Sequence, residues 1–308
     1  MLRYIIAGGS GLIGQALLTT LAQNHHQTQA SVLVLTRTPR AVSHLAAAFP
    51  SLNLQIVSYE DLFTATGPRC TPDDIIINLA GENIGAQRLT SARLRQLLDS
   101  RLNIINTLMR WCEHRAQSPR LFIQASAMAA FEDSDIEKSD EGLIVPPHKA
   151  PGVYLTSLHD LAVSLEATAL AFPGPTLCVR LPLVLSPVAP LVQKLAALPR
   201  LKVLDGCNYL PLASATDCAR ALLFAACQEL SGIIAINAPH YVNLRTLLLS
   251  LGKQHIPAIP TLSVGLKLGS KLDGRMGLFL ENKKIKSARL LQAGFVFLHP
   301  QALSVLPH

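Results

Sequence analysis

The chain has 308 residues, of which 49% are hydrophobic and only 15% are charged, a length and composition suited to one large domain or a main domain with a smaller appendage. The basic residues behind the formal net charge of +7 are scattered, aromatic residues make up 5%, and no DNA- or RNA-binding motif is present, so we expect no nucleic-acid partner. No apolar run is long enough to span a bilayer, so we expect no membrane partner.

The six cysteines show no CxxC or Cys/His spacing, so we expect no metal site. Most of them lie in apolar segments, which is typical of small core residues in a reducing compartment. The apolar N-terminal stretch contains regularly spaced glycines and no clean cleavage site, so we do not interpret it as a signal peptide. These features favour a cytoplasmic protein.

The first predicted elements are a short strand at residues 4–6, a glycine-rich turn and a helix with apolar residues at helical spacing. In IAGGSGLIGQAL, Gly8 permits a tight turn out of the strand, Gly11 lets the backbone approach a pyrophosphate, and Gly14 lets helix and strand pack closely. The helix N-terminus presents unpaired amides and a positive dipole end to phosphates. This context favours a dinucleotide-binding turn over a glycine-rich turn without a ligand.

The second predicted strand, SVLVLTRTPR, ends at Arg37, and Arg40 follows. An NAD-preferring site usually carries an acid here that holds the adenosine ribose, and this segment has none. Arginine can stack on adenine and pair with a 2′-phosphate through its planar guanidinium. The sequence therefore favours NADP(H) over NAD(H), with a surface arginine of no special role as the alternative.

The segment DDIIINLAGENIG predicts a buried strand at residues 75–79 that is followed by small residues, against which a cofactor's ribose and phosphates can lie. A long amphipathic helix, RLTSARLRQLLDSRLNIINTLMRWCEHR, comes next, and then a strand that ends near Ser126. Alternating strands and helices of this kind predict an α/β fold with a Rossmann-like, doubly wound parallel sheet. A ligand binds outside the carboxyl ends of such strands, where these residues lie.

The order of IAGGSGLIGQAL, LTRTPR, INLAGENI, LDSRLNIINTL and IQASAM resembles that of the atypical extended short-chain dehydrogenase/reductases. More narrowly, the chain is similar to their epimerase-like subfamily, described as nucleoside-diphosphate-sugar epimerases or cell-division-inhibitor-like proteins. The resemblance implies an NAD(P)-binding domain of the epimerase/dehydratase type over residues 1–180 and a smaller, substrate-side portion over residues 181–308. It also implies that residues 243–305, approximately, form the subfamily's C-terminal domain of unknown function.

The resemblance further implies which residues form the site. Ser126 matches a serine or threonine that hydrogen-bonds the substrate, and Tyr154 lies near the position of the acid/base tyrosine, so these two are the candidate catalytic residues. Arg180 matches an arginine that follows a strand, for which a structural ion pair is the alternative. The cofactor-binding residues that the resemblance implies are Gly8, Ser10, Gly11, Leu12, Ile13, Gly14, Arg37, Leu79, Ala80 and Gly81.

The chain departs from the family's Tyr-x-x-x-Lys pattern, because Leu158 stands where the lysine would be. That lysine binds the nicotinamide ribose and lowers the pKa of the tyrosine from about 10 towards working pH. His159 is adjacent but lies off the corresponding helix face. Without the lysine, Tyr154 is as readily explained as a packing aromatic at the start of a helix. The subfamily often lacks the pair, so the departure does not exclude membership.

Two functions remain open from the sequence. The first is an NADP(H)-dependent oxidoreductase or epimerase for a small carbonyl or sugar-nucleotide-like substrate, in which Ser126 polarises the reacting oxygen and Tyr154 or a water molecule carries the proton. The second is a non-catalytic NADP(H)-binding sensor or interaction protein with a degenerate active site. The enzymatic family favours the first, and the missing lysine favours the second. A homodimer is compatible with either.

Three further expectations concern the second half of the chain. We expect Asp217 to serve near a helix N-terminus. We expect the Pro-rich segment 145–152 to act as a lid or hinge. The densest basic run, KKIKSAR at residues 283–289, is expected on a solvated helix face, within a helix that closes over the substrate cleft.

Overall fold

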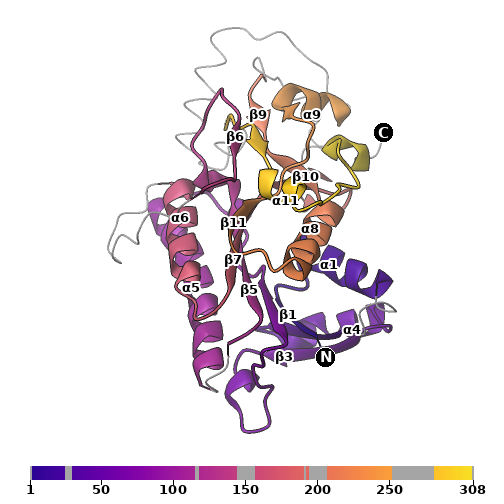
Figure 1. The fold of residues 1–308 in the computed structure, drawn as a ribbon, viewed down its shortest axis with the longest axis vertical. Coiled ribbons are helices and arrows are strands. Elements are labelled where there is room, and N and C mark those ends of the chain that lie inside the picture. The colour runs from indigo at the N-terminus through magenta and orange to yellow at the C-terminus, as the bar shows by residue number, and fades with distance from the viewer. Residues whose placement is uncertain are drawn as a thin grey trace.

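The computed structural model describes residues 2–24, 30–114, 118–143, 157–190, 192–193, 207–251 and 281–306. Its centre is a parallel sheet of seven strands (Figure 1). The strands are β1 (Arg3–Ala7), β2 (Ser31–Thr36), β3 (Asn53–Ser58), β4 (Asp74–Asn78), β5 (Leu121–Ala127), β7 (Thr176–Leu181) and β11 (Gly232–Ala235). Their order across the sheet is β11-β7-β5-β4-β1-β2-β3. From β1, the strands β2 and β3 extend the sheet to one side, and β4 and the later strands extend it to the other, while all strands stay parallel. The expected Rossmann-like, doubly wound sheet is therefore confirmed, with its switch point between β1 and β4.

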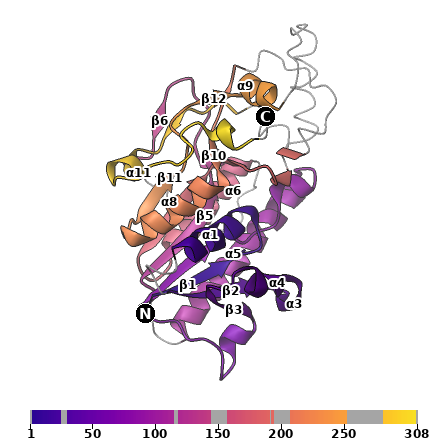
Figure 2. The same ribbon diagram turned by 90° about the vertical axis from the view of Figure 1, so that its right-hand side faces the viewer.

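Helices cover both faces of the sheet (Figures 1 and 2). The helices α1 (Leu12–Gln23) and α8 (Ala215–Cys227) pack together on one face, and α5 (Ser91–Glu113) and α6 (Leu158–Leu170) pack together on the other. The strands are apolar at consecutive positions because each face needs its own core. In β1, for example, Ile6 packs on the side of α1 and α8, and Ile5 on the side of α5 and α6.

Short elements lie beyond the carboxyl ends of the main strands, at the top of Figure 1. They include β6 (Lys138–Ser139) paired with β13 (Ile285–Lys286), β8 (Leu183–Leu185) paired with β10 (Leu212–Ser214), and β9 (Tyr209–Leu210) paired with β12 (Val242–Asn243). The helices α9 (Leu244–Ser250) and α11 (Ala288–Gln292) belong to the same portion. An apolar cluster of this portion also receives Leu12, the first residue of α1, so the C-terminal portion packs directly beside the glycine turn.

The main sheet does not end at residue 180, the boundary that the sequence suggested. The edge strand β11 pairs in parallel with β7, and α8 contributes buried residues to the core beside α1. The nucleotide-binding domain therefore extends beyond that boundary, because β11 adds an edge strand to the sheet and α8 covers part of one face.

Asp217 confirms the expectation of a role at a helix N-terminus. It lies in the first turn of α8, where Ser214 is the N-cap, and its buried carboxylate accepts hydrogen bonds from the backbone N–H groups of Leu298 (2.7 Å) and His299 (2.8 Å). The same carboxylate thus joins the helix to the C-terminal tail.

The basic run at residues 283–289 differs from the expected solvated helix face. Lys283 is buried and its ammonium group lies 3.0 Å from the carboxylate of Glu281 and 3.6 Å from that of Asp133. The strand β13 follows it, and helix begins only at Ala288. The run therefore has a structural role, because β13 pairs with β6 and Lys283 lies buried beside two carboxylates. The Pro-rich segment 145–152 lies outside the described residues.

Four of the six cysteines are buried free thiols, as expected, whereas Cys207 and Cys227 are exposed. The Sγ atoms of Cys70 and Cys112 lie 3.4 Å apart. In the part of the chain that the structure describes, no helix combines the length and apolar character needed to cross a membrane.

Candidate functional site

A cavity of about 900 Å³ lies at the carboxyl ends of β1, β2 and β4, beside the inner face of α5. This is the switch point of the sheet, where doubly wound folds bind their ligands. Seven of the residues predicted to bind a cofactor line it together: Gly8, Ser10, Gly11, Arg37, Leu79, Ala80 and Gly81. Leu12, Ile13 and Gly14 follow the turn in α1 and are not part of the lining.

The three glycines of the turn have different reasons to be glycine. Gly8 has a φ of +86°, and a Cβ there would lie 2.9 Å from the backbone of Leu79 and Ala80. A Cβ on Gly14 would lie 2.3 Å from the carbonyl oxygen of Gly8. A Cβ on Gly11 would meet only that same oxygen, at 3.3 Å. The packing of the protein itself therefore requires Gly8 and Gly14 but hardly requires Gly11, which lines the cavity and is the N-cap of α1.

Arg37 and Tyr59 lie on the side of the cavity formed by β2 and β3. Arg37 follows β2 and is exposed, and Tyr59 follows β3 and is half-buried. Burial raises the pKa of the Tyr59 phenol to about 12, and the nearby Arg37 guanidinium opposes this rise. A cation and a neutral aromatic ring therefore lie close together, and of the two the Arg37 guanidinium is the group that can bind a phosphate.

Polar contacts hold the end of β4 in place. The buried side chain of Asn78 donates to Oε1 of Gln124 on β5 (2.7 Å) and accepts from the backbone N–H of Ala80 (3.1 Å). The guanidinium of Arg101 packs against Gly81, where a Cβ would lie 2.8 Å from Cζ. An arginine of α5 therefore occupies the space beside Gly81, in addition to the cavity that Gly81 lines.

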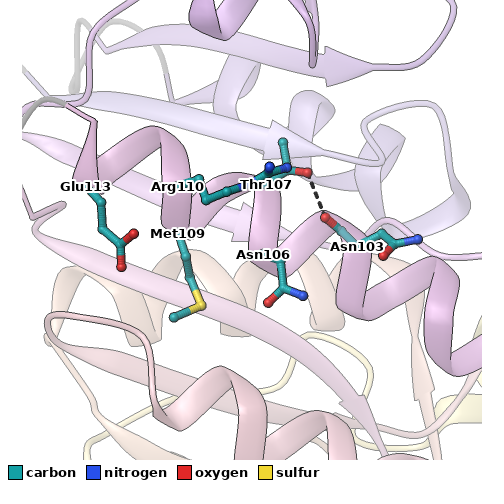
Figure 3. Close-up of a pocket in the computed structure, with 6 residues that line it drawn as sticks. All are labelled: Asn103, Asn106, Thr107, Met109, Arg110 and Glu113. Atoms are coloured by element: carbon teal, nitrogen blue, oxygen red, sulfur yellow. Dashed lines mark hydrogen bonds between the residues drawn. The ribbon is translucent and has the colours of Figure 1, made fainter.

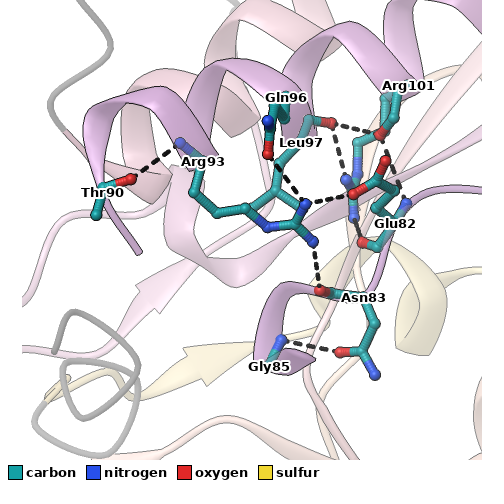
Figure 4. A network of polar contacts seen from close by, with 9 residues as sticks. Glu82, Asn83, Gly85, Thr90, Arg93, Gln96, Leu97 and Arg101 are labelled. Atoms are coloured by element: carbon teal, nitrogen blue, oxygen red, sulfur yellow. Dashed lines mark hydrogen bonds and ion pairs between the residues drawn. The ribbon is translucent and has the colours of Figure 1, made fainter. Parts of the chain in front are cut away.

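Arg101 belongs to a polar network that joins the loop after β4 to α5 (Figure 4). It donates to the carbonyl oxygens of Leu97 (2.9 Å) and Glu82 (3.0 Å). Burial lowers the pKa of Arg101. The carboxylate of Glu82 pairs with Arg93, which also donates to the carbonyl oxygen of Asn83 (3.2 Å). Glu82 thus binds Arg93 through its carboxylate and Arg101 through its backbone carbonyl oxygen.

A second hollow, of about 580 Å³, lies along α5 (Figure 3). All of its lining residues belong to this helix, and it shares Asn103 and Thr107 with the first cavity. It is therefore a groove on the helix surface that continues from the first cavity.

Ser126 lies at the end of β5, opposite Arg180 on β7. Its hydroxyl donates to Oε1 of Glu166 on α6 at 2.6 Å, and Arg180 forms two hydrogen bonds to the same carboxylate, at 2.7 and 2.8 Å. All three residues are buried, and the guanidinium also lies 4.5 Å above the centre of the Phe131 ring. Arg180 thus forms the structural ion pair that the sequence left open. Ser126 does not line the first cavity.

The helix α6 begins at Leu158, with Ser157 as its N-cap and Asp160 completing a capping box. Residue 158 is therefore the first residue of the helix, and not one helical turn inside it as the expected tyrosine–lysine spacing required. Its side chain packs against an apolar cluster that joins α5 and α6, so leucine has a packing role here. Nδ1 of His159 lies 3.0 Å from the carbonyl oxygen of Ala129. Tyr154 lies outside the described residues.

Sequence reasoning missed four residues that shape the site: Glu82, Arg93, Arg101 and Glu166. Glu166 offered a signal, because it is the one acid beyond the first turn of the apolar helix LHDLAVSLEATAL, and a parallel sheet buries one face of such a helix. The two arginines are part of a polar helix face in the sequence, and nothing local distinguishes them from the exposed Arg95.

The sequence is similar to those of known proteins over most of its length. Residues 4–236 match the model of the NAD dependent epimerase/dehydratase family. The epimerase family protein SDR39U1 of Bos taurus is 26% identical over 97% of each chain. The epimerase family protein YfhF of Bacillus subtilis is 30% identical over 44% of this chain and 40% of its own.

Solved structures share the fold. Human epimerase family protein SDR39U1 (isoform 2), crystallised with NADPH, has a TM-score of 0.75, 21% identity and coverage of 98% of both chains. UDP-glucuronic acid 4-epimerase from Bacillus cereus, in complex with NAD, has a TM-score of 0.68 at 15% identity and covers 99% of this chain and 95% of its own. Both likenesses extend over the sheet and the smaller C-terminal portion.

Proposed function

The chain belongs to the NAD-dependent epimerase/dehydratase family, and from this membership we propose that it is an NADP(H)-dependent oxidoreductase or epimerase. Its substrate is a small carbonyl compound or a sugar-nucleotide-like molecule. The cofactor binds in the cavity at the switch point, with its pyrophosphate at the glycine turn and its 2′-phosphate at Arg37.

The observation that carries this proposal is the contrast between Gly11 and its neighbours. Gly8 and Gly14 are explained by the packing of the protein, whereas a Cβ on Gly11 would meet a single protein atom, at 3.3 Å, and Gly11 lines the cavity. A ligand that approaches the backbone at Gly11 explains why this residue is glycine, and the N-terminus of α1 favours an anion there. The human relative crystallised with NADPH agrees with the choice of cofactor.

The cofactor, when bound, supplies hydride transfer at its nicotinamide ring. In the protein, the hydroxyl of Ser126 donates a hydrogen bond to Glu166, so the Ser126 oxygen can only accept a further hydrogen bond. Ser126 is therefore suited to accept a hydrogen bond from a substrate hydroxyl, and less suited to polarise a carbonyl oxygen as a donor. This geometry favours alcohol oxidation, or the oxidative half of an epimerisation, with Tyr154 as the further proton carrier.

A second candidate, a non-catalytic NADP(H) sensor, is favoured by Leu158. The residue that would otherwise be a lysine near the nicotinamide ribose packs into an apolar cluster between α5 and α6. In this alternative the cofactor site stays functional, while the fold signals whether the site is occupied.

The test of the proposal combines binding with turnover. Thermal unfolding is followed with and without NADPH for the unmutated protein and for Gly11→Val, whose branched side chain occupies the pyrophosphate space. Turnover is then measured at 340 nm with NADP⁺ and NADPH against alcohols, aldehydes, ketones and nucleotide sugars, with Ser126→Ala and Tyr154→Phe as variants. Stabilisation by NADPH that Gly11→Val abolishes, together with turnover that Ser126→Ala reduces, supports the enzyme. Stabilisation without turnover on any substrate supports the sensor, and no stabilisation contradicts both.

We also place the protein in a reducing compartment such as the cytoplasm. The buried Cys70 and Cys112 are free thiols although their Sγ atoms lie 3.4 Å apart. In an oxidising compartment such a pair would be expected to form a disulfide.

A further inference from the structure

The cavity contains a second arginine whose hydrogen bonding is incomplete. Arg93 lies in the first turn of α5, lines the cavity and is only 7% exposed. Its Nη1 pairs with Glu82 and lies 3.4 Å from Oε1 of Gln96, and its Nη2 donates to Asn83 (Figure 4). These contacts fix the plane and position of the guanidinium before any ligand binds.

The Nε of Arg93 is different. Among the described residues, it is the single buried side-chain nitrogen or oxygen that has no hydrogen-bond partner. Folded proteins rarely leave a buried donor unsatisfied, and on a charged group the loss is larger than on a neutral one. A fixed cation that lacks one partner, at the wall of a cavity, is well placed to bind an acceptor from a ligand.

The local charge balance favours an anionic acceptor. The Glu82 carboxylate pairs with Arg93, and its side chain is 38% exposed, whereas Arg101 donates to the backbone carbonyl oxygen of Glu82. Two guanidinium groups therefore lie beside a single, partly solvated carboxylate. Asp99 is the other carboxylate of the lining, and it is exposed. Burial lowers the pKa of Arg101, the Glu82 carboxylate opposes this, and the neighbouring Arg93 guanidinium adds to the lowering.

We infer that Arg93 is an oxyanion-binding residue of this cavity and donates from Nε to a phosphate or carboxylate oxygen of the bound molecule. The inference rests on the proposed function, because it assumes that the cavity holds the cofactor. Two sources provide this chemistry, namely the pyrophosphate of the dinucleotide and an acidic group on the substrate. Arginine suits either source because its planar fork matches both kinds of oxyanion.

The experiment is isothermal titration calorimetry of the unmutated protein and three variants. Arg93→Gln removes the charge, Arg93→Lys keeps a charge but lacks the Nε–H, and Arg95→Gln is the matched control, since Arg95 is exposed on the same helix and outside the lining. Each is titrated with NADPH, with NADH, and with inorganic phosphate in the absence and presence of saturating NADPH. Urea unfolding of each variant establishes that it folds, and Arg93→Lys carries the test if Arg93→Gln does not.

If the oxyanion is the pyrophosphate, Arg93→Gln weakens NADPH and NADH equally, by tenfold or more, and Arg93→Lys weakens both by about fivefold, while Arg95→Gln stays within twofold. If it belongs to the substrate, the dinucleotides are unaffected and phosphate binding to the NADPH-saturated protein is lost. Changes below twofold for all ligands in both Arg93 variants overturn the inference. If the unmutated protein binds neither dinucleotide, the proposed function fails by itself. Phosphate binding to the cofactor-free protein, lost in Arg93→Gln but kept in Arg95→Gln, would then still support the inference, and its persistence in Arg93→Gln would overturn it.

Discussion

The hydroxyl of Ser126 donates a 2.6 Å hydrogen bond to the carboxylate of Glu166, which Arg180 holds from the other side. This contact connects the end of β5, the middle of α6 and β7 at a fully buried point. Because the Ser126 hydroxyl donates its one hydrogen to Glu166, Ser126 can only accept a further hydrogen bond. The Glu166 carboxylate also has a structural role, since it joins α6 to β5 and β7.

Glu166→Gln is expected to destabilise the protein by about 3–5 kcal/mol, because it leaves the buried Arg180 guanidinium without a countercharge. Glu229→Gln is the matched control, since it breaks the exposed pair with Arg120 and should cost about 0–1 kcal/mol. Urea unfolding followed by circular dichroism measures both. Equal losses would show that the buried pair contributes no more than a surface pair.

Gly81→Ala is expected to destabilise the protein by about 1 kcal/mol, because the added methyl displaces the Arg101 guanidinium from its hydrogen bonds to Leu97 and Glu82. In the Arg101→Ala background the same change should cost little, so a double-mutant cycle should give a coupling energy above 0.5 kcal/mol, approximately. Gly85→Ala is the control, because a Cβ there meets only Oδ1 of Asn83 at 3.5 Å. Additive effects of Gly81→Ala and Arg101→Ala would contradict the packing described here.

The two glycines at the start of α1 are expected to separate stability from binding. Gly14→Ala should destabilise the fold, since its Cβ would lie 2.3 Å from the carbonyl oxygen of Gly8. Gly11→Ala should cost about 0.5–2 kcal/mol, the range for replacing an N-cap residue by alanine, and so less than Gly14→Ala, yet weaken NADPH strongly. Unfolding curves and calorimetric titrations decide the matter. A Gly11→Ala variant that binds NADPH normally would show that the ligand does not approach this residue.

Tyr59 is expected to make the protein less stable at alkaline pH. Its phenol has a pKa of about 12 in the folded protein and about 10 in the unfolded chain, so the folded state stays protonated up to a higher pH. The resulting stabilisation is complete below pH 10 and is lost as the pH rises from 10 to 12. Tyr4 and Tyr241 are also shifted upwards, so the comparison is with Tyr59→Phe, whose stability should fall less over this interval. Parallel losses in the two proteins would show that Tyr59 ionises normally.

The doubly wound parallel sheet, and the cavity at the carboxyl ends of its strands, could be predicted because their signals are local. A strand, three spaced glycines and an amphipathic helix, followed by a second strand, specify one βαβ unit. The end of that second strand then places Arg37 at the carboxyl edge of the sheet. The order of the elements then determines which ends meet at the cavity.

The remainder depends on contacts between residues far apart in the sequence. Glu166 meets Ser126 across 40 residues and Arg180 across 14, and Arg101 reaches Glu82 across 19. The burial of Lys283 depends on the pairing of β13 with β6, which involves elements of two residues each. Short elements of this kind have no periodicity that a sequence pattern can reveal.

The most direct test of the proposed cofactor preference is a calorimetric comparison of NADPH and NADH for the unmutated protein and for Arg37→Ala, with Arg40→Ala as control. The unmutated protein should bind NADPH more tightly than NADH. Arg37→Ala should lose about 1.5–3 kcal/mol for NADPH, the range for hydrogen bonds to a charged group, and little for NADH. Arg40→Ala should have the smaller effect, because Arg40 does not line the cavity. Equal affinities for NADPH and NADH in the unmutated protein would contradict the assignment of the 2′-phosphate to Arg37.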